Sequence, residues 1–259
     1  PAASSIFAME VVSVGVMHYA AIVPCFLSAI IARGISKYMG IAATTFSIGD
    51  VPSINFASGS KLVLLGIIFA AVSMLYIVAF ETFSKFFKAV LKNQYLIMAV
   101  GGGIVALLTL VLQSNEYLGT GISQIPDLLF VSAPWYVFLL KILFTAVSLG
   151  AGFKGGEIAP AMFVGASLGS FLAPMFGLPI PLVVACGMAA VFCGVTNSPI
   201  TAIVFSVELF GASQIYYTMI CVAVSYLISE YFSIYKTQKI MYSKYSTTFI
   251  NRKSHHIDT

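Results

Sequence analysis

Long apolar runs that contain no Asp, Glu, Lys or Arg alternate along this chain with short polar or glycine-rich stretches. Five such runs cover residues 11–32, 62–80, 93–115, 158–207 and 209–229. A helix needs about 20 mostly apolar residues to cross a bilayer. The pattern therefore predicts a chain that crosses the membrane several times.

Breaks inside two of these runs predict helices that stop part-way through the membrane. Pro24 lies inside the first run, so we expect a short helix, a bend and a second helix that ends at Arg33 and Lys37. The run 158–207 is interrupted repeatedly by glycine and proline. Irregular backbone at membrane depth is tolerated only where protein buries it or water reaches it, and transporters keep their ion sites at such breaks.

Composition and charge support a membrane protein. Of the 259 residues 59% are hydrophobic and only 8% are charged, which excludes a soluble domain of this size. The basic residues stand singly at the ends of apolar runs, so we expect no nucleic-acid partner. We predict an all-α polytopic membrane protein with a transmembrane core over 1–245 and a polar cytoplasmic tail over 246–259. The lysines between 85 and 92 and the basic residues after 235 are expected on the cytoplasmic side.

A repeated spacing of Pro, Phe and Glu indicates that the chain has two related halves. Pro1, Phe7 and Glu10 stand at the same offsets as three residues of a later apolar helix, which are Pro199, Phe205 and Glu208. Matched helices in two halves are typical of transporters with an inverted internal repeat. Glu10 and Glu208 are candidates for gating or proton transfer because a carboxylate inside a bilayer is costly, and a matched structural role such as capping a broken helix is the alternative.

The glycine-rich segment 150–160 is the candidate anion site. Its sequence is GAGFKGGEIAP, and glycines before a helix leave several backbone amides uncovered at the positive end of the helix dipole. The alternative is a tight connection between two helices in which Lys154 pairs with Glu157. Nothing in the chain indicates an enzyme, a metal site or a cofactor, and the four cysteines lie inside apolar segments without metal-ligand or redox spacing.

Four segments together resemble the CLC family of chloride channels and proton/chloride exchangers. They are GGEIAP followed by AMFVGASLG at 155–169, the pair of segments at 187–192 and 197–208, the first ten residues, and KIMY at 239–242. In that family a Gly-x-Phe-x-Pro element places backbone amides on a central chloride. The resemblance covers essentially the whole chain and implies a homodimer in the bilayer, each subunit with its own anion pathway.

By this resemblance the anion site comprises Gly156, Glu157 and Ile158 with the hydroxyl of Tyr242, and chloride is the transported ligand rather than a cofactor. The family's serine loop and gating glutamate correspond to segments before residue 1. Tyr235 and Tyr245 are alternatives to Tyr242, because Ile240 stands where the family often has proline.

Two further departures bear on function. Glu157 and Ile158 replace the usual apolar residue and phenylalanine, so Glu157 is either turned away from the ion or part of an altered selectivity. Val11 occupies the position of the exchangers' inner proton-transfer glutamate. We therefore expect a passive voltage-gated chloride channel in a bacterial inner or plasma membrane. The alternatives are a proton-coupled chloride exchanger, a fluoride exporter of the same family, a secondary transporter of an organic anion, and a non-conducting scaffold.

Overall fold

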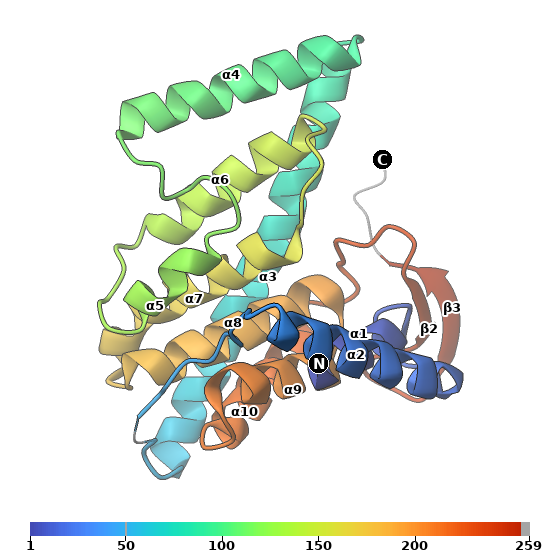
Figure 1. The fold of residues 1–259 in the computed structure, drawn as a ribbon, viewed down its shortest axis with the longest axis vertical. Coiled ribbons are helices and arrows are strands. Elements are labelled where there is room, and N and C mark those ends of the chain that lie inside the picture. Colours follow the sequence, from blue (N-terminus) through green and yellow to red (C-terminus); the bar gives the residue numbers. More distant parts are fainter. Residues whose placement is uncertain (50, 255–259) are drawn as a thin grey trace.

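The computed structural model describes residues 1–49 and 51–254, and helices make up most of it (Figure 1). The long helices are α2 (Ile22–Tyr38), α3 (Phe56–Val90), α4 (Gln94–Leu112), α7 (Ile158–Phe176) and α8 (Ile180–Thr196). The shorter ones are α1 (Ala2–Glu10), α5 (Ile125–Leu128), α6 (Val137–Gly150), α9 (Pro199–Phe210) and α10 (Ile215–Ile228), with 3-10 turns η1 (Tyr19–Ala21) and η2 (Ile122–Gln124).

The core is built around the hairpin of α7 and α8, against which α3 and α10 pack. Every residue of α8 from Leu182 to Thr196 is buried, so this helix lies at the centre of the molecule. In Figure 1, α4 runs along the outer edge, and its main contact is with α6. A buried centre and apolar outer helices are the arrangement expected of a protein whose outer surface contacts lipid.

Glycines allow α7 and α8 to touch backbone to backbone. A Cβ atom added at Gly165 would meet the carbonyl oxygen of Gly187, and one added at Gly187 would meet that of Gly165. One turn further along, a Cβ at Gly169 would lie 2.6 Å from the Val183 oxygen. Small residues are the usual means of close helix packing in membranes. This contact fixes where α7 begins relative to the rest of the core.

The lengths of the helices confirm a polytopic chain that contains part-spanning helices. Among the described residues, four apolar segments are long enough to cross a membrane, namely 19–38, Phe56–Val90, Gln94–Leu112 and Ile158–Phe176. The helix α9 has 12 residues and α10 has 14, so at 1.5 Å per residue each spans well under the ~30 Å of a hydrocarbon core. The helix α7, inside the glycine- and proline-rich run, is longer than we expected.

Two local predictions need correction. The first break falls at residues 11–18 rather than at Pro24, because Pro24 lies in the first turn of α2, where its missing N–H leaves no hydrogen bond unmade. The chain is also not purely helical. Strands β1 (Ser13–Val14), β2 (Lys239–Tyr242) and β3 (Phe249–Lys253) form a small sheet, parallel between β1 and β2 and antiparallel between β2 and β3. Part of the expected polar tail therefore contributes a strand.

Candidate functional site

The carboxylate of Glu10 caps the start of α9. It accepts hydrogen bonds from the backbone amides of Ile200 (3.0 Å) and Thr201 (2.8 Å), and from the Thr201 hydroxyl (2.6 Å). The first amides of a helix have no partner within it, and the helix dipole favours a negative charge there. A charge-assisted cap of this kind explains how the buried Glu10 is held inside the protein.

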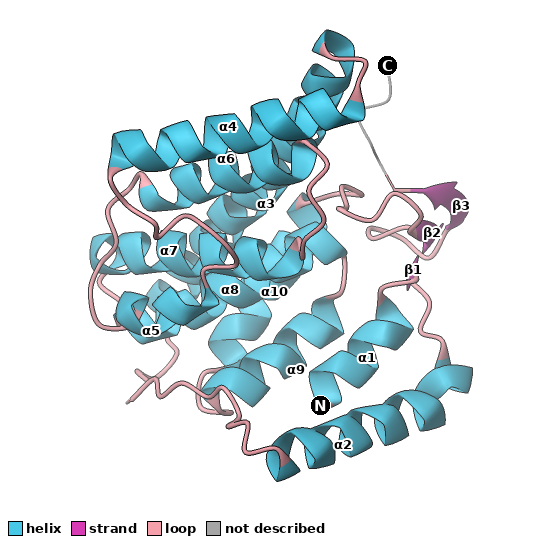
Figure 2. Cartoon of the chain, turned by 45° about the horizontal axis from the view of Figure 1, so that its top comes forward, coloured by secondary structure: helices cyan, strands magenta, loops and turns pink. Residues whose placement is uncertain are grey.

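Glu208 makes the reciprocal contact. It stands near the end of α9 and accepts hydrogen bonds from the amides of Ala2 (2.8 Å) and Ala3 (3.2 Å) at the start of α1. The two helices therefore run antiparallel, side by side, as Figure 2 shows. The matched phenylalanines, Phe7 and Phe205, both lie against the ring of Phe192, at centroid distances of 5.6 and 5.5 Å. The two segments with the same Pro-Phe-Glu spacing thus form a symmetrical pair of helices, and the glutamate of each caps the start of the other.

The start of α7 has no carboxylate cap of this kind among the described residues. Within the part of the chain that the structure describes, no side chain caps the amides of its first turn. Glu157 is the last residue before the helix, and its carbonyl oxygen accepts a hydrogen bond of 2.8 Å from the hydroxyl of Tyr76 on α3. Tyr76 is buried and fixes the backbone at this point. The amides at the start of α7 are consequently held in place without a protein acceptor.

These amides border a cavity of about 640 Å³. Gly156, Glu157 and Ile158 line one side of the cavity, and Tyr235 and Lys236 line another. Within the described residues, the Tyr235 hydroxyl has no hydrogen-bond partner, so it is available to a ligand. The half-buried carboxylate of Glu157 lies within electrostatic range of that hydroxyl and of Lys236.

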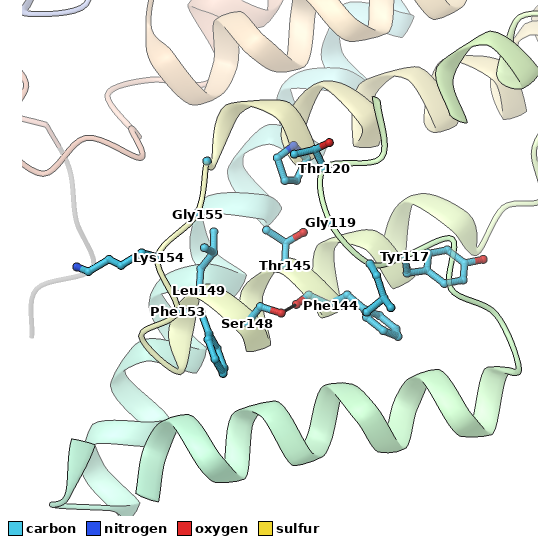
Figure 3. Close-up of a pocket in the computed structure, with 13 residues that line it drawn as sticks. Tyr117, Gly119, Thr120, Phe144, Thr145, Ser148, Leu149, Phe153, Lys154 and Gly155 are labelled. Atoms are coloured by element: carbon cyan, nitrogen blue, oxygen red, sulfur yellow. Dashed lines mark hydrogen bonds between the residues drawn. The ribbon is translucent and has the colours of Figure 1, made fainter. Parts of the chain in front are cut away.

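Among the described residues, Lys154 does not pair with Glu157, as it would if the glycine segment were only a tight connection between two helices. In Figure 3 its side chain extends away from the hydroxyls of Thr145 and Ser148. The structure therefore does not support the Lys154–Glu157 pair, and the orientation of the Glu157 carboxylate relative to the ion stays a prediction.

The structure does not bring Tyr242 to this cavity. Tyr242 lies on β2, packs on Phe249 at 5.6 Å, and lines a different cavity of about 620 Å³ that Glu10 and Asn197 also border. The reason is the chain path after α10, which passes Tyr235 across the start of α7 before it turns into β2. Tyr242 therefore does not line the cavity of residues 156–158, whereas the alternative Tyr235 does, and the identity of the tyrosine at the anion site stays a prediction.

A polar network joins the break after α1 to the C-terminal segment. Val11 itself is half-buried, and its carbonyl oxygen accepts a hydrogen bond from Gln238 (2.8 Å). Asn197, in the left-handed conformation at the end of α8, contacts Gln238 (3.1 Å) and accepts from Lys244 (2.6 Å). Lys244 also donates to the Tyr226 carbonyl at the end of α10 (2.8 Å), and burial lowers the pKa of Lys244 to about 8. This network positions the chain that carries Tyr235, and the sequence did not predict it.

A second cavity adjoins the other side of the glycine segment (Figure 3). It encloses about 210 Å³ and is bordered by Thr145 and Ser148 of α6, by the loop 117–120, and by the glycine segment. The fully buried Lys141 holds that loop by donating to the carbonyls of Tyr117 (3.1 Å) and Gly119 (2.8 Å). Residues 155 and 156 line both cavities, so the glycine segment separates two spaces that could admit an ion.

Comparison with known proteins identifies the family. The model of the family described as "Voltage gated chloride channel" matches residues 1–230. The chain belongs to the CLC family. It is 36% identical over 95% of its length to the "Chloride/fluoride channel protein" of Pseudomonas syringae pv. tomato, 56% of which it covers.

Other members of the CLC family are similar over less of the chain or at lower identity. The "Voltage-gated ClC-type chloride channel ClcB" of Salmonella typhimurium is 33% identical over 46% of this chain and is itself covered to 30%. The ClcB of Escherichia coli O81 is 26% identical over 83%, with 54% of it covered. The chain thus spans about half the length of the curated relatives it matches.

A crystal structure of a CLC-type fluoride/proton antiporter superposes on the chain with a TM-score of 0.88. Its sequence is 32% identical, and the match covers 93% of this chain and 61% of the antiporter. The predicted CLC fold, a polytopic membrane protein with broken helices, is confirmed by this match. The family consists of ion channels and transporters.

We predict that Glu10→Gln in the full-length protein lowers thermal stability, because the amide keeps one acceptor oxygen but loses the charge that faces the start of α9. The loss should be about 1–3 kcal/mol, the value of hydrogen bonds to a charged group. Thermal unfolding of the detergent-solubilised protein measures it. Glu116→Gln, in a surface loop, is the matched control and should leave the midpoint unchanged. An equal midpoint for both variants would show that Glu10 is not a structural cap.

Proposed function

We propose that the full-length protein carries fluoride and chloride across a bacterial cell membrane, and that the anion binds between the amides at the start of α7 and the hydroxyl of Tyr235. The observation that carries this proposal is the cavity that residues 156–158, at the uncapped start of α7, line together with Tyr235. Amide and hydroxyl donors hold an anion weakly enough for it to leave again. Gly156, Glu157 and Ile158 supply the backbone side of this site.

The residues of the site favour fluoride transport that is coupled to proton movement. A charged Glu157 repels an anion in the same cavity, whereas a protonated Glu157 removes the repulsion and offers an O–H donor. Anion binding and proton binding at Glu157 are therefore linked, each strengthening the other. Fluoride is the halide that accepts the strongest hydrogen bonds. Two relatives that match more than nine-tenths of this chain are described as a chloride/fluoride channel protein and as a fluoride/proton antiporter.

A passive chloride channel is the second candidate, and Val11 is the observation that favours it. An apolar side chain, which cannot titrate, stands where the exchangers carry an inner glutamate, and the carbonyl oxygen of this residue accepts a hydrogen bond from Gln238. Voltage gating would then accompany passive conduction, as the family's name suggests.

Efflux of fluoride and of chloride from liposomes that contain the full-length protein, with external pH recorded in the same trace, separates the two candidates. We expect fluoride to leave in fixed ratio to protons, and we expect Glu157→Gln to abolish proton movement because the amide cannot titrate. Chloride efflux without proton movement would establish the passive channel instead. If neither halide leaves, halide transport itself is refuted.

The choice between the two tyrosines has a direct test in anion affinity. Tyr235→Phe removes the phenol O–H proposed to contact the ion, so fluoride should bind about 10-fold or more weakly, as expected for a lost hydrogen bond to a charge. Tyr242→Phe is the matched control and should bind as the parent protein does. Calorimetric titration of the full-length variants measures both. A loss confined to Tyr242→Phe would return the site to the cavity that Tyr242 lines with Glu10 and Asn197.

We also propose a homodimer that pairs α2, α9 and α10 of the two copies. The face of α2 is apolar and exposed at Val23, Leu27, Ile30, Ile31 and Ile35. Cys25 on α2 is half-buried, whereas Cys221 on α10 is fully buried, so only Cys25 suits a cross-link. We expect oxidation in the membrane to give a covalent dimer that Cys25→Ser abolishes. A cross-link that persists in Cys25→Ser would place the interface elsewhere.

A further inference from the structure

Four lysines from two distant parts of the chain border one cavity of about 390 Å³. Lys85 and Lys88 belong to the last turns of α3, and Lys236 and Lys253 belong to the segment after α10. Glu81, Ser84 and Ser254 complete the lining. Residues about 150 positions apart therefore bring their ammonium groups to a single place.

The charges of this lysine cavity do not balance. Among the described lining residues are four lysines and one carboxylate, that of Glu81, so these residues carry a formal net charge of +3. Like charges at close range repel, and the repulsion grows where protein excludes water. A single halide would leave two positive charges uncompensated. A ligand with two negative charges relieves most of the repulsion.

The hydrogen-bonding groups of the lysine cavity match the oxygens of a phosphate. Each ammonium offers three donors and no acceptor, and Ser84 borders the same space, whereas the Ser254 hydroxyl donates to the Tyr235 carbonyl. Lysine binds phosphate as a point charge. A lining dominated by donors suits a ligand that has acceptor oxygens on every side.

The place of the cavity connects it both to the membrane surface and to the anion site. Lys85 and Lys88 follow the apolar part of α3, where basic residues next to a transmembrane helix meet lipid headgroups. Lys236 borders the lysine cavity and also the cavity of Glu157 and Tyr235. A ligand in the first cavity would neutralise a charge that attracts anions into the second.

We propose that a phosphate-bearing ligand with two negative charges binds the lysine cavity and slows halide passage by neutralising Lys236. The shared chemistry is a phosphomonoester or diphosphate, supplied either by an anionic lipid headgroup or by a free phosphate compound. The binding stands on the cavity alone, whereas its inhibitory effect rests on the proposed function.

The test uses the full-length protein and the double variant Lys85→Gln/Lys88→Gln. Its matched control is Arg33→Gln/Lys37→Gln, a basic pair on α2 that lies outside the cavity. Binding of phosphatidic acid is measured by native mass spectrometry and binding of pyrophosphate by calorimetry. We expect at least one of these two ligands to bind the parent and control proteins, and the cavity variant to bind it roughly 30-fold more weakly, the effect of two lysines near a charged surface.

Halide efflux is then compared between phosphatidylcholine vesicles, the same vesicles with phosphatidic acid, and the same vesicles with pyrophosphate added. The parent and control proteins should be slowed several-fold by phosphatidic acid, by pyrophosphate or by both, and the arm that slows them identifies the source of the phosphate. The cavity variant should be slowed by neither. Lys253→Gln, on an exposed strand, repeats the measurement if the double variant folds poorly.

Equal binding by the parent and the cavity variant overturns the phosphate site. If the cavity variant instead transports more slowly in every vesicle and responds to phosphate as the parent does, the lysines only attract the transported halide, and the proposal is wrong. Phosphate binding without any halide efflux would refute the proposed function and leave the phosphate site standing.

Discussion

The amides at the start of a helix need an acceptor, and inside a bilayer water does not supply one. This constraint shapes the starts of three helices, α1, α7 and α9. At α1 and α9 the acceptor is a carboxylate from the opposite helix, so Glu10 and Glu208 lock two short helices together. At α7 no side chain of the described residues fills that role, and a cavity lies in front of the amides instead. The same physical demand thus produces a structural cap in one place and a candidate anion site in another.

The rest of the core keeps the start of α7 in position. The backbone contact between Gly165 and Gly187 sets α7 against the fully buried α8. Tyr76 holds the Glu157 carbonyl from α3, and the network of Asn197, Gln238 and Lys244 holds the segment that brings Tyr235 across the cavity. Amides that donate to a weakly held ion must not move to meet it, because pre-organised donors lose little entropy on binding. Rigidity at this point is what the packing provides.

Local signals in the sequence predicted much of the fold. Uncharged runs predicted the apolar helices, and the Pro-Phe-Glu spacing predicted a pair of matched helices. The anion site that the glycine-rich segment predicted stays a prediction. The features that the sequence did not predict depend on contacts between residues that are distant in the chain. The break before α2 is set by pairing of Ser13 and Val14 with β2, and the tyrosine at the site is set by the chain path after α10. Neither is visible in a window of neighbouring residues, and the buried contact of Tyr76 with Glu157 spans 81 positions.

The central claim is that backbone amides at the start of α7 bind the transported anion. The most direct measurement replaces the backbone N–H of Ile158 in the full-length protein by an ester oxygen, which removes one donor and leaves every side chain unchanged. Fluoride affinity of the ester protein should fall about 10-fold or more, the value of a hydrogen bond to a charge. The same replacement at Ile104 in α4, away from both cavities, serves as the control and should leave affinity unchanged. If the Ile158 ester binds fluoride as tightly as the parent protein, the anion is held elsewhere and the account is wrong.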